Sequence, residues 1–328
     1  MKQFATHRIF SISNAYDFDR VALDVFRFQY QNNQVYHQFC NHLGKTPKTV
    51  SLTREIPFLP ISFFKTHAVR STEQEAETVF TSSGTTKTST SKHFVPEIEL
   101  YEKSFLSAFY KFYGSPKEFC ILALLPSYLE REGSSLIYMV NDLINKSAHP
   151  SSGFYLHNLD ELHQNLLKLE QKGTKCLLIG VSFALLDLAE RFSMNLQNTI
   201  IMETGGMKGR RKELIREELH QLLQKGLGVE KVHSEYGMTE LLSQAYSKGN
   251  GIFKTPPWMK IITRDTEDPL SIQSAGKTGG INVIDLANIY SCSFIATQDL
   301  GKAYPNGTFE VLGRFDDSDI RGCNLMVL

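Results

Sequence analysis

The chain has no excess of charge of either sign, because 35 Lys and Arg residues balance 35 Asp and Glu residues. A neutral chain does not attract nucleic acid or an anionic membrane surface as a basic chain does, so we expect neither as a partner. The most apolar stretch, "CLLIGVSFALLDLA", is too short to cross a bilayer and contains Asp187. The N-terminus lacks an apolar segment of the signal-peptide type. These absences predict a cytoplasmic protein with no membrane span.

Cysteine is scarce and scattered. The five cysteines form no C-x-x-C pair, which argues against a structural zinc site. An odd, sparse set fits a reducing cytoplasm better than a disulfide scaffold. The apolar share of 41% is ordinary for a globular protein and too high for disorder. A length of 328 residues allows one large domain or two smaller ones.

The pattern of apolar residues predicts an α/β fold. Residues 17–40 read as helical, with Ala22, Phe26 and Tyr30 spaced four apart on one face, and residues 56–67 as an irregular buried segment broken by prolines. Apolar runs then alternate with amphipathic runs, which predicts a mostly parallel sheet covered by helices on both faces. The expected strands are 119–126, 175–180, 198–203 and 229–237, and the expected helices are 159–173, 183–192 and 212–223. From about Trp258 onward, short strands and Gly turns predict a small β-rich subdomain with strands at 280–287, 292–301 and 308–315.

The stretch "FTSSGTTKTSTSKHF", residues 80–94, suits phosphate but is not a P-loop. Its flanks are typical of strands, and Gly84 has no partner glycine in the P-loop spacing. Hydroxyls, backbone N–H groups beside a glycine, and the charge of Lys87 or Lys92 can all hold an anion. Composition alone also fits a plain flexible loop.

Two later stretches carry groups that suit a nucleotide. In "SEYGMTE", residues 234–240, Tyr236 offers a flat face for a base and Glu240 an oxygen ligand for Mg²⁺. Taken alone, this stretch also fits a turn followed by the start of a helix. In "TQDLGKAYPNGTFEVLGRFDD", Asp299 could accept ribose hydroxyls and Arg314 could bind phosphate or ribose. Taken alone, Asp299 fits a turn residue and Arg314 a surface charge.

In their order along the chain, "SSGTTK", "YGMTE" and "D…G…GRFDD" resemble the adenylate-forming superfamily of acyl-CoA synthetases and firefly luciferase. "IPFLPISFFKTH", "LLPSYLEREGSSLIYMV", "SEYGMTELLSQAYS" and "IRGCNL" narrow the resemblance to the acyl-protein synthetase (LuxE) family of the bacterial fatty-acid reductase system. The resemblance runs through nearly the whole chain. It implies that ATP activates a carboxylic acid, expected to be a fatty acid, as an acyl-adenylate with release of pyrophosphate.

The resemblance also implies a role for each matching residue. The loop over Thr81–Lys87 would embrace the triphosphate, Thr239 would contact the α-phosphate, Glu240 would hold Mg²⁺, and Asp299 would bind the ribose hydroxyls beside Arg314. Tyr236 would lie against the adenine, and the backbone of Gly205 and Gly206 would approach it. Gly237 is a further expected cofactor-binding residue. The expected phosphate-loop residues are Thr81, Ser82, Ser83, Gly84, Thr85, Thr86 and Lys87.

By the same resemblance, the acyl group passes from AMP to a cysteine near the C-terminus and then to an acyl-accepting or reductase partner protein. Cys323 stands at that position, and Arg321 could favour its thiolate. A buried, incidental cysteine is the alternative. Together with Lys87 and Thr239, Cys323 completes the expected catalytic set.

Two departures from the superfamily pattern shape the expected domain organisation. Lys87 stands where a glycine usually follows S-G-T-T, and the sequence ends soon after "GRFDD", where most members continue into a mobile lid domain. We expect an adenylate-forming core over residues 1–312, β-rich from about 258, with the lid domain absent or vestigial. Residues 313–328 would form a hinge-like tail that carries Cys323.

Two other functions stay open at this point. The first is an acyl- or aryl-CoA ligase of the phenylacetate-CoA ligase type, which would not need Cys323. The second is a non-catalytic binding subunit of a biosynthetic complex, against which the retained Glu240, Asp299 and Arg314 count. We interpret His67 and His93, near the loop segments, as structural residues rather than substrate contacts.

Overall fold

The computed structural model describes residues 4–82, 90–125, 133–155, 158–205 and 214–314. The chain divides into two compact units. The first contains residues 1–104, 239–243 and 254–328, and the second contains residues 105–238 and 244–253. The chain first passes between the units within helix α5 (Ile98–Tyr113) and last passes within the short strand β10 (Phe253–Lys254). No helix in the described ranges is long and apolar enough to cross a membrane.

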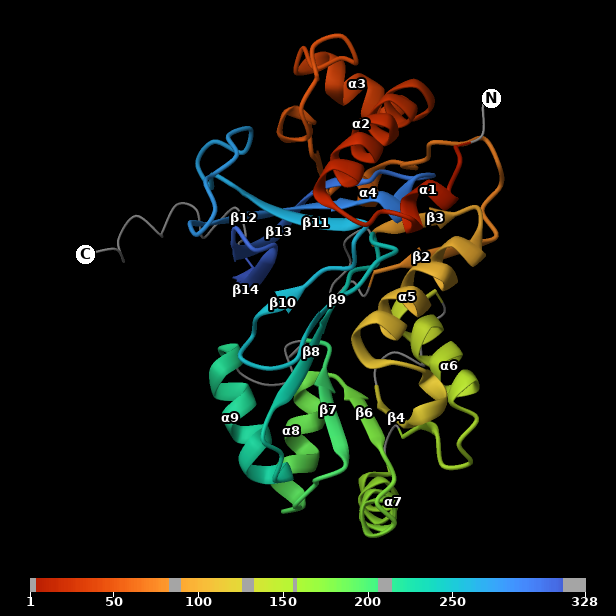
Figure 1. Cartoon of the computed structure of the whole chain (residues 1–328), viewed down its shortest axis with the longest axis vertical. Coiled ribbons are helices and arrows are strands. Elements are labelled where there is room, and N and C mark those ends of the chain that lie inside the picture. The colour runs from red at the N-terminus through yellow and green to blue at the C-terminus, as the bar shows by residue number, and fades with distance from the viewer. Residues whose placement is uncertain (1–3, 83–89, 126–132, 156–157, 206–213, 315–328) are drawn as a thin grey trace, which may run out of the picture. The chain divides into compact units, whose positions relative to one another are not determined.

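The second unit is built on a parallel sheet (Figure 1). Its strands run in the order β5-β4-β6-β7-β8, and β9 pairs antiparallel with β8. Helix α6 packs against β4, and α8 and α9 pack against each other. The strands are β4 (Cys120–Leu124), β5 (Gly153–Phe154), β6 (Cys176–Gly180), β7 (Thr199–Glu203), β8 (Val232–Tyr236) and β9 (Ala245–Ser247). The helices are α6 (Ser135–Ser147), α7 (Leu159–Gln171), α8 (Ser182–Arg191) and α9 (Arg216–Leu227).

The sequence predicted this sheet correctly. Every residue of β4 and β6 is buried, as a continuous apolar run requires when both faces of a parallel sheet are covered. Helix α7 ends two residues before Gly173, whose φ of 65° provides the left-handed turn that leaves the helix. Helix α9 was expected to begin at residue 212. It begins at Arg216, and residues 206–213 lie outside the described part of the chain.

The first unit carries the antiparallel strands that were expected after Trp258. They run in the order β11-β12-β13-β14, β1 pairs parallel with β13, and β2 and β3 form a separate hairpin. The strands are β1 (Leu59–Pro60), β2 (Thr78–Thr81), β3 (Lys92–Val95), β11 (Met259–Arg264), β12 (Thr278–Asp285), β13 (Phe294–Ala303) and β14 (Thr308–Arg314). The helices are α1 (His7–Phe10), α2 (Ala15–Asn32), α3 (Gln34–His42) and α4 (Phe63–Thr66).

The helical stretch expected over residues 17–40 is two helices, because Asn33 interrupts it. Asn33 has extended backbone angles, its N–H donates to Gln29 at the end of α2, and its side chain accepts the N–H of Tyr36 at the start of α3. One Asn therefore ends one helix and caps the next. Ala22 and Phe26 are fully buried on α2, as the spacing predicted. Phe26 and Tyr36 both pack on Phe294 of β13.

Candidate functional site

The segment Thr239–Ser243 belongs to the first unit, where a buried carboxylate holds its backbone. Asp285 Oδ2 accepts the N–H of Leu242 and the N–H of Ser243, each at 2.9 Å, and its Oδ1 accepts the hydroxyl of Ser243 at 2.6 Å. Burial raises the pKa of Asp285 to about 6 although these hydrogen bonds favour its ionised form. Asn288 adds a bond from its side-chain amide to the carbonyl of Glu240 at 2.7 Å. The segment is thereby fixed by groups from the end of β12 and the turn after it.

His93, on β3, holds the same segment from another direction. One ring nitrogen lies 2.9 Å from the carbonyl oxygen of Thr239, and the other lies 2.9 Å from the hydroxyl of Ser291. The side chain is buried, and burial lowers the pKa of His93 to about 4 against the opposing effect of the Thr239 carbonyl. Both ring nitrogens are thus engaged by the protein, as a structural role of His93 requires.

Glu240 is the charged residue that this framework carries. It is 6% exposed, and burial raises the pKa of its carboxyl. A hydrogen bond with Ser91 and the positive charges of Arg314 and Lys65 act in the opposite direction. The first unit therefore places a buried carboxylate within electrostatic reach of two cations, which suits a site for phosphate and a metal ion.

Asp299 and Arg314 face each other on neighbouring strands. They are directly paired in the register of β13 and β14, with Arg314 Nε 3.6 Å from Asp299 Oδ1. The side chain of Asp299 is 10% exposed and that of Arg314 is 73% exposed. The backbone N–H of Asp299 donates to the hydroxyl of Thr297 at 3.1 Å. The two residues that were expected to lie close together do so, although they are fifteen positions apart in the sequence.

The residues on both sides of the expected phosphate loop pair with each other as a β-hairpin. Thr81 is the last residue of β2 and is paired with Lys92 of β3. Beyond it, the N–H of Ser82 donates to the carbonyl of Ser91 at 3.1 Å, and the Ser82 hydroxyl accepts the N–H of Ser91 at 2.9 Å. The strand–loop–strand arrangement predicted for this stretch is therefore confirmed at both flanks. The predicted site residues Ser83, Gly84, Thr85, Thr86 and Lys87 lie outside the described residues.

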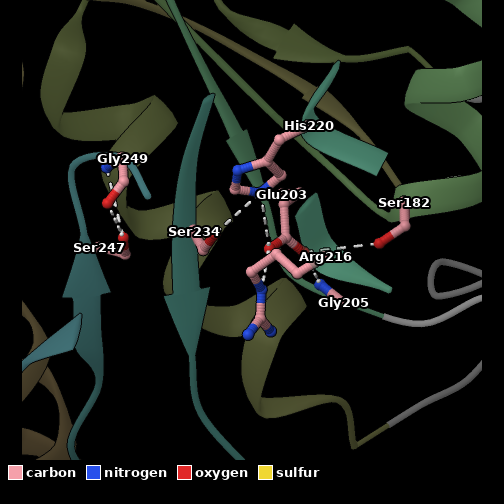
Figure 2. Close-up of polar contacts among 8 residues, drawn as sticks. All are labelled: Ser182, Glu203, Gly205, Arg216, His220, Ser234, Ser247 and Gly249. Carbon is pink, nitrogen blue, oxygen red and sulfur yellow. Dashed lines mark hydrogen bonds and ion pairs between the residues drawn. The ribbon is translucent and has the colours of Figure 1, made fainter. Parts of the chain in front are cut away.

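In the second unit, Glu203 is the centre of a buried polar cluster at the carboxyl end of β7 (Figure 2). Its Oε2 accepts the N–H of Gly205 at 2.6 Å and lies 3.5 Å from the hydroxyl of Ser182. Its Oε1 accepts from Arg216 Nε at 3.2 Å and lies 3.5 Å from His220 Nε2. The predicted residue Gly205 has a φ of 73°, which a residue with a side chain rarely adopts. The adjacent prediction, Gly206, lies outside the described residues.

The cluster keeps Glu203 ionised despite its depth. Burial alone would raise the pKa of this carboxyl. The hydrogen bond with His220, the charge of Arg216 and a contact with Ser234 outweigh burial and hold the pKa at about 2. Ligands of parallel α/β sheets bind at the carboxyl ends of the strands, and the cluster lies at that edge.

Tyr236 and Gly237 end the next strand, β8. The ring of Tyr236 meets that of Phe253 edge to face, with the ring centroids 6.0 Å apart. A side chain at Gly237 would require the carboxyl of Glu235 to move. Burial and the nearby negative charge of Glu203 raise the pKa of Glu235 to about 8. The helix start considered for this stretch is not observed, because residues 237–244 form turns and irregular chain.

The sequence profile of the LuxE acyl-protein synthetases matches residues 13–328. The chain belongs to the LuxE family. This family of ligases is the one that the motifs indicated, so the predicted resemblance is confirmed.

Among curated relatives, a long-chain-fatty-acid–luciferin-component ligase of Vibrio harveyi is 23% identical over 332 residues, an alignment that covers 93% of this LuxE-family chain and 86% of the relative. Among solved structures, 2-hydroxyisobutyryl-CoA ligase in complex with 2-HIB-AMP and CoA has a TM-score of 0.66 at 12% identity, over 97% of this chain and 80% of that one. ATP-bound MatB of Rhodopseudomonas palustris has a TM-score of 0.52 at 17% identity, over 72% of this chain and 47% of MatB. These two structures establish that the LuxE-family chain shares the fold of adenylate-forming ligases.

The motifs did not reveal the residues that support this LuxE-family site. Asp285 and Asn288 lie in "IDLAN", Glu203 directly precedes "TGG", and Arg216 lies in the charged run "GRRKELIREE". One signal was present: a Glu or Asp that ends a buried apolar strand has to find a partner inside the protein. Cys323 lies outside the described residues, so its expected role stays a prediction.

Proposed function

We propose that this LuxE-family chain activates a long-chain fatty acid with ATP, forming an acyl-adenylate and releasing pyrophosphate. The observation that carries the proposal is the family match over residues 13–328. The name of the Vibrio harveyi relative supports a long-chain fatty acid as the substrate. The ATP bound to MatB and the acyl-AMP bound to 2-hydroxyisobutyryl-CoA ligase support the nucleotide chemistry. A carboxylate is a poor electrophile, and AMP supplies the leaving group that an acyl transfer needs.

In this proposal, the first unit handles the phosphates and the ribose. Thr239 contacts the α-phosphate, and the loop over residues 81–87 surrounds the triphosphate. Asp299 accepts the ribose hydroxyls, with Arg314 beside it. What supports these roles is that Asp285, Asn288 and His93 hold the Thr239–Ser243 segment rigidly, since catalysis at phosphorus depends mainly on positioning and on charge stabilisation.

The residues fit one Mg²⁺ ion that is shared with the substrate. No group of three or more His, Cys, Asp or Glu among the described residues is arranged to hold a metal by itself. Mg²⁺ does not need such a group, because proteins usually bind it through one or two carboxylates together with substrate phosphates. Glu240 is the carboxylate that would hold it. When bound, Mg²⁺ would neutralise charge on the phosphate oxygens.

The nucleobase is assigned to the second unit. Tyr236 would lie against adenine, with Gly237 beside it, and the backbone of Gly205 and Gly206 would approach the ring. The buried hydroxyl of Thr204, directly before Gly205, has no hydrogen-bond partner within the described ranges, which fits a segment that can still bind a ligand.

For the second half-reaction, we propose that the Cys323 thiolate attacks the acyl carbonyl of acyl-AMP. A thioester bond forms, the bond between the acyl carbon and the phosphate oxygen breaks, and AMP leaves. The acyl group then passes to a partner protein. The test incubates the chain with ATP and radiolabelled fatty acid. Wild type should retain acid-stable label that hydroxylamine releases, and Cys323→Ser should lose this label while pyrophosphate exchange continues. Label that persists on the variant would contradict the role of Cys323, and acyl-CoA release upon addition of CoA would favour a CoA ligase.

A further inference from the structure

The two segments that the proposed function assigns to adenine follow or end the paired strands β7 and β8, and an ion pair adds a side-chain link between them. Glu203 accepts the N–H of Gly205 at 2.6 Å and pairs with Arg216 at 3.2 Å. The guanidinium carbon of Arg216 lies 5.0 Å from the ring centroid of Phe253, and Phe253 meets Tyr236 edge to face. A continuous line of contacts therefore runs from the Gly205 backbone to the Tyr236 ring, and every member belongs to the second unit.

This ion pair is more deeply buried than the pair between Arg191 and Asp160 in the same unit. The side chain of Glu203 is 2% exposed and that of Arg216 is 24% exposed. By contrast, the pair between Arg191 and Asp160 joins side chains that are 53% and 64% exposed. Burial of two charges costs desolvation energy that a surface pair does not, so a deep pair is a weak source of stability. A buried pair is best justified where it fixes one arrangement of the groups around it.

The geometry of Arg216 suits such a role. A guanidinium is planar, so it can donate to a carboxylate along its edge and lie over an aromatic ring with its face. Arg216 does both at once, to Glu203 and to Phe253. A lysine in its place could keep the charge but not both contacts. Neither Glu203 nor Arg216 needs to touch the nucleotide for this effect.

We propose that Arg216 and Glu203 are positioning residues, which fix the Gly205 backbone and the Tyr236 ring relative to each other and thereby set the affinity for the adenine of ATP. The inference rests on the proposed function, because that proposal assigns Gly205 and Tyr236 to adenine.

Four variants separate positioning from folding. Arg216→Gln removes the arginine that pairs with Glu203, and Glu203→Gln removes the carboxylate that pairs with Arg216, so each is expected to destabilise the protein. The double variant, Glu203→Gln with Arg216→Gln, removes both charges, so its unfolding midpoint should return toward that of wild type. Arg216→Lys retains the charge but loses the planar double contact.

The assay measures nucleotide binding directly. Isothermal titration gives the affinity for ATP, and competition gives the affinity for inorganic tripolyphosphate, which has no base. The double variant and Arg216→Lys should bind ATP about 10- to 100-fold more weakly, because stacking of a base on an aromatic ring contributes roughly this much affinity. Their affinity for tripolyphosphate should not change. In pyrophosphate exchange, the KM for ATP should rise while the KM for the acid stays constant.

Arg191→Gln is the matched control. Arg191 also combines an ion pair, with Asp160 at 2.6 Å, and a position over an aromatic ring, with Phe192 at 5.1 Å. Its loss should leave ATP affinity unchanged. A folded double variant that binds ATP like wild type, or one that loses ATP and tripolyphosphate equally, would overturn the inference alone. Failure of the wild-type chain to bind ATP would overturn the proposed function as well.

Discussion

Replacement of Glu235 by Gln should change how the stability of the protein depends on pH. Burial and the charge of Glu203 raise the pKa of Glu235 from 4.5 to about 8. Between these values the folded chain keeps the proton that the unfolded chain has lost. The free energy of unfolding therefore falls as pH rises from 4.5 to 8. At about 1.4 kcal/mol per pH unit, this contribution reaches up to about 5 kcal/mol.

Gln has nearly the shape of the protonated carboxyl and cannot ionise, so Glu235→Gln should lack this slope. Urea unfolding at half-unit steps from pH 4.5 to 8.5 measures this slope. The difference in unfolding free energy between variant and wild type should grow as the pH rises. Glu230→Gln, at a side chain that is 87% exposed, is the control and should follow wild type. Glu203→Gln removes a negative charge that raises the pKa of Glu235. In this variant the loss of stability with rising pH should therefore end at a lower pH than in wild type. Parallel curves for wild type and Glu235→Gln would refute the reasoning.

Three further changes test the framework around Thr239–Ser243. Asp285→Ala deprives buried N–H groups of their acceptor and should cost roughly 2–5 kcal/mol of unfolding free energy and most of the exchange activity. The control, Asp265→Ala, removes a half-buried carboxylate that accepts two turn N–H groups and should cost much less. Burial lowers the pKa of His93 from 6.5 to about 4, so its contribution to the free energy of unfolding is fully present above pH 6.5 and is lost as pH falls toward 4. In urea titrations this loss should reach up to about 3 kcal/mol for wild type and should be absent from His93→Gln. Equal losses in the two proteins would contradict this prediction. Glu240→Gln should slow pyrophosphate exchange about 100-fold or more while its unfolding midpoint changes little, and unchanged exchange would remove Glu240 from the metal site.

Much of the fold could be predicted because its signals are local. The apolar runs at 120–124 and 176–180 are buried on both faces, and their continuous apolar composition predicts that burial. The break between α2 and α3 was missed because the apolar spacing continues across Asn33. Only the capping bonds of that residue, to groups on either side, show where one helix ends and the next begins.

The motif residues of the candidate site could be predicted from the sequence, but the residues that hold them in place could not. Motif order brought Glu240, Asp299 and Arg314 together in one interpretation, and the structure places Asp299 beside Arg314. The bond between Asp285 and Ser243 spans 42 positions. A single sequence does not show which distant N–H or O–H group donates to a buried carboxylate. The same holds for Arg216, because a charged residue at the start of an amphipathic helix usually faces solvent.

Fatty-acid-dependent exchange of pyrophosphate into ATP tests the central claim most directly. The wild-type chain is incubated with ATP, Mg²⁺, labelled pyrophosphate and a series of fatty acids of increasing chain length. We predict label in ATP that depends on the acid, is strongest for a long-chain acid, and disappears when Mg²⁺ is chelated. Absence of exchange with every acid, both alone and with candidate partner proteins present, would contradict the claim that this chain forms an acyl-adenylate.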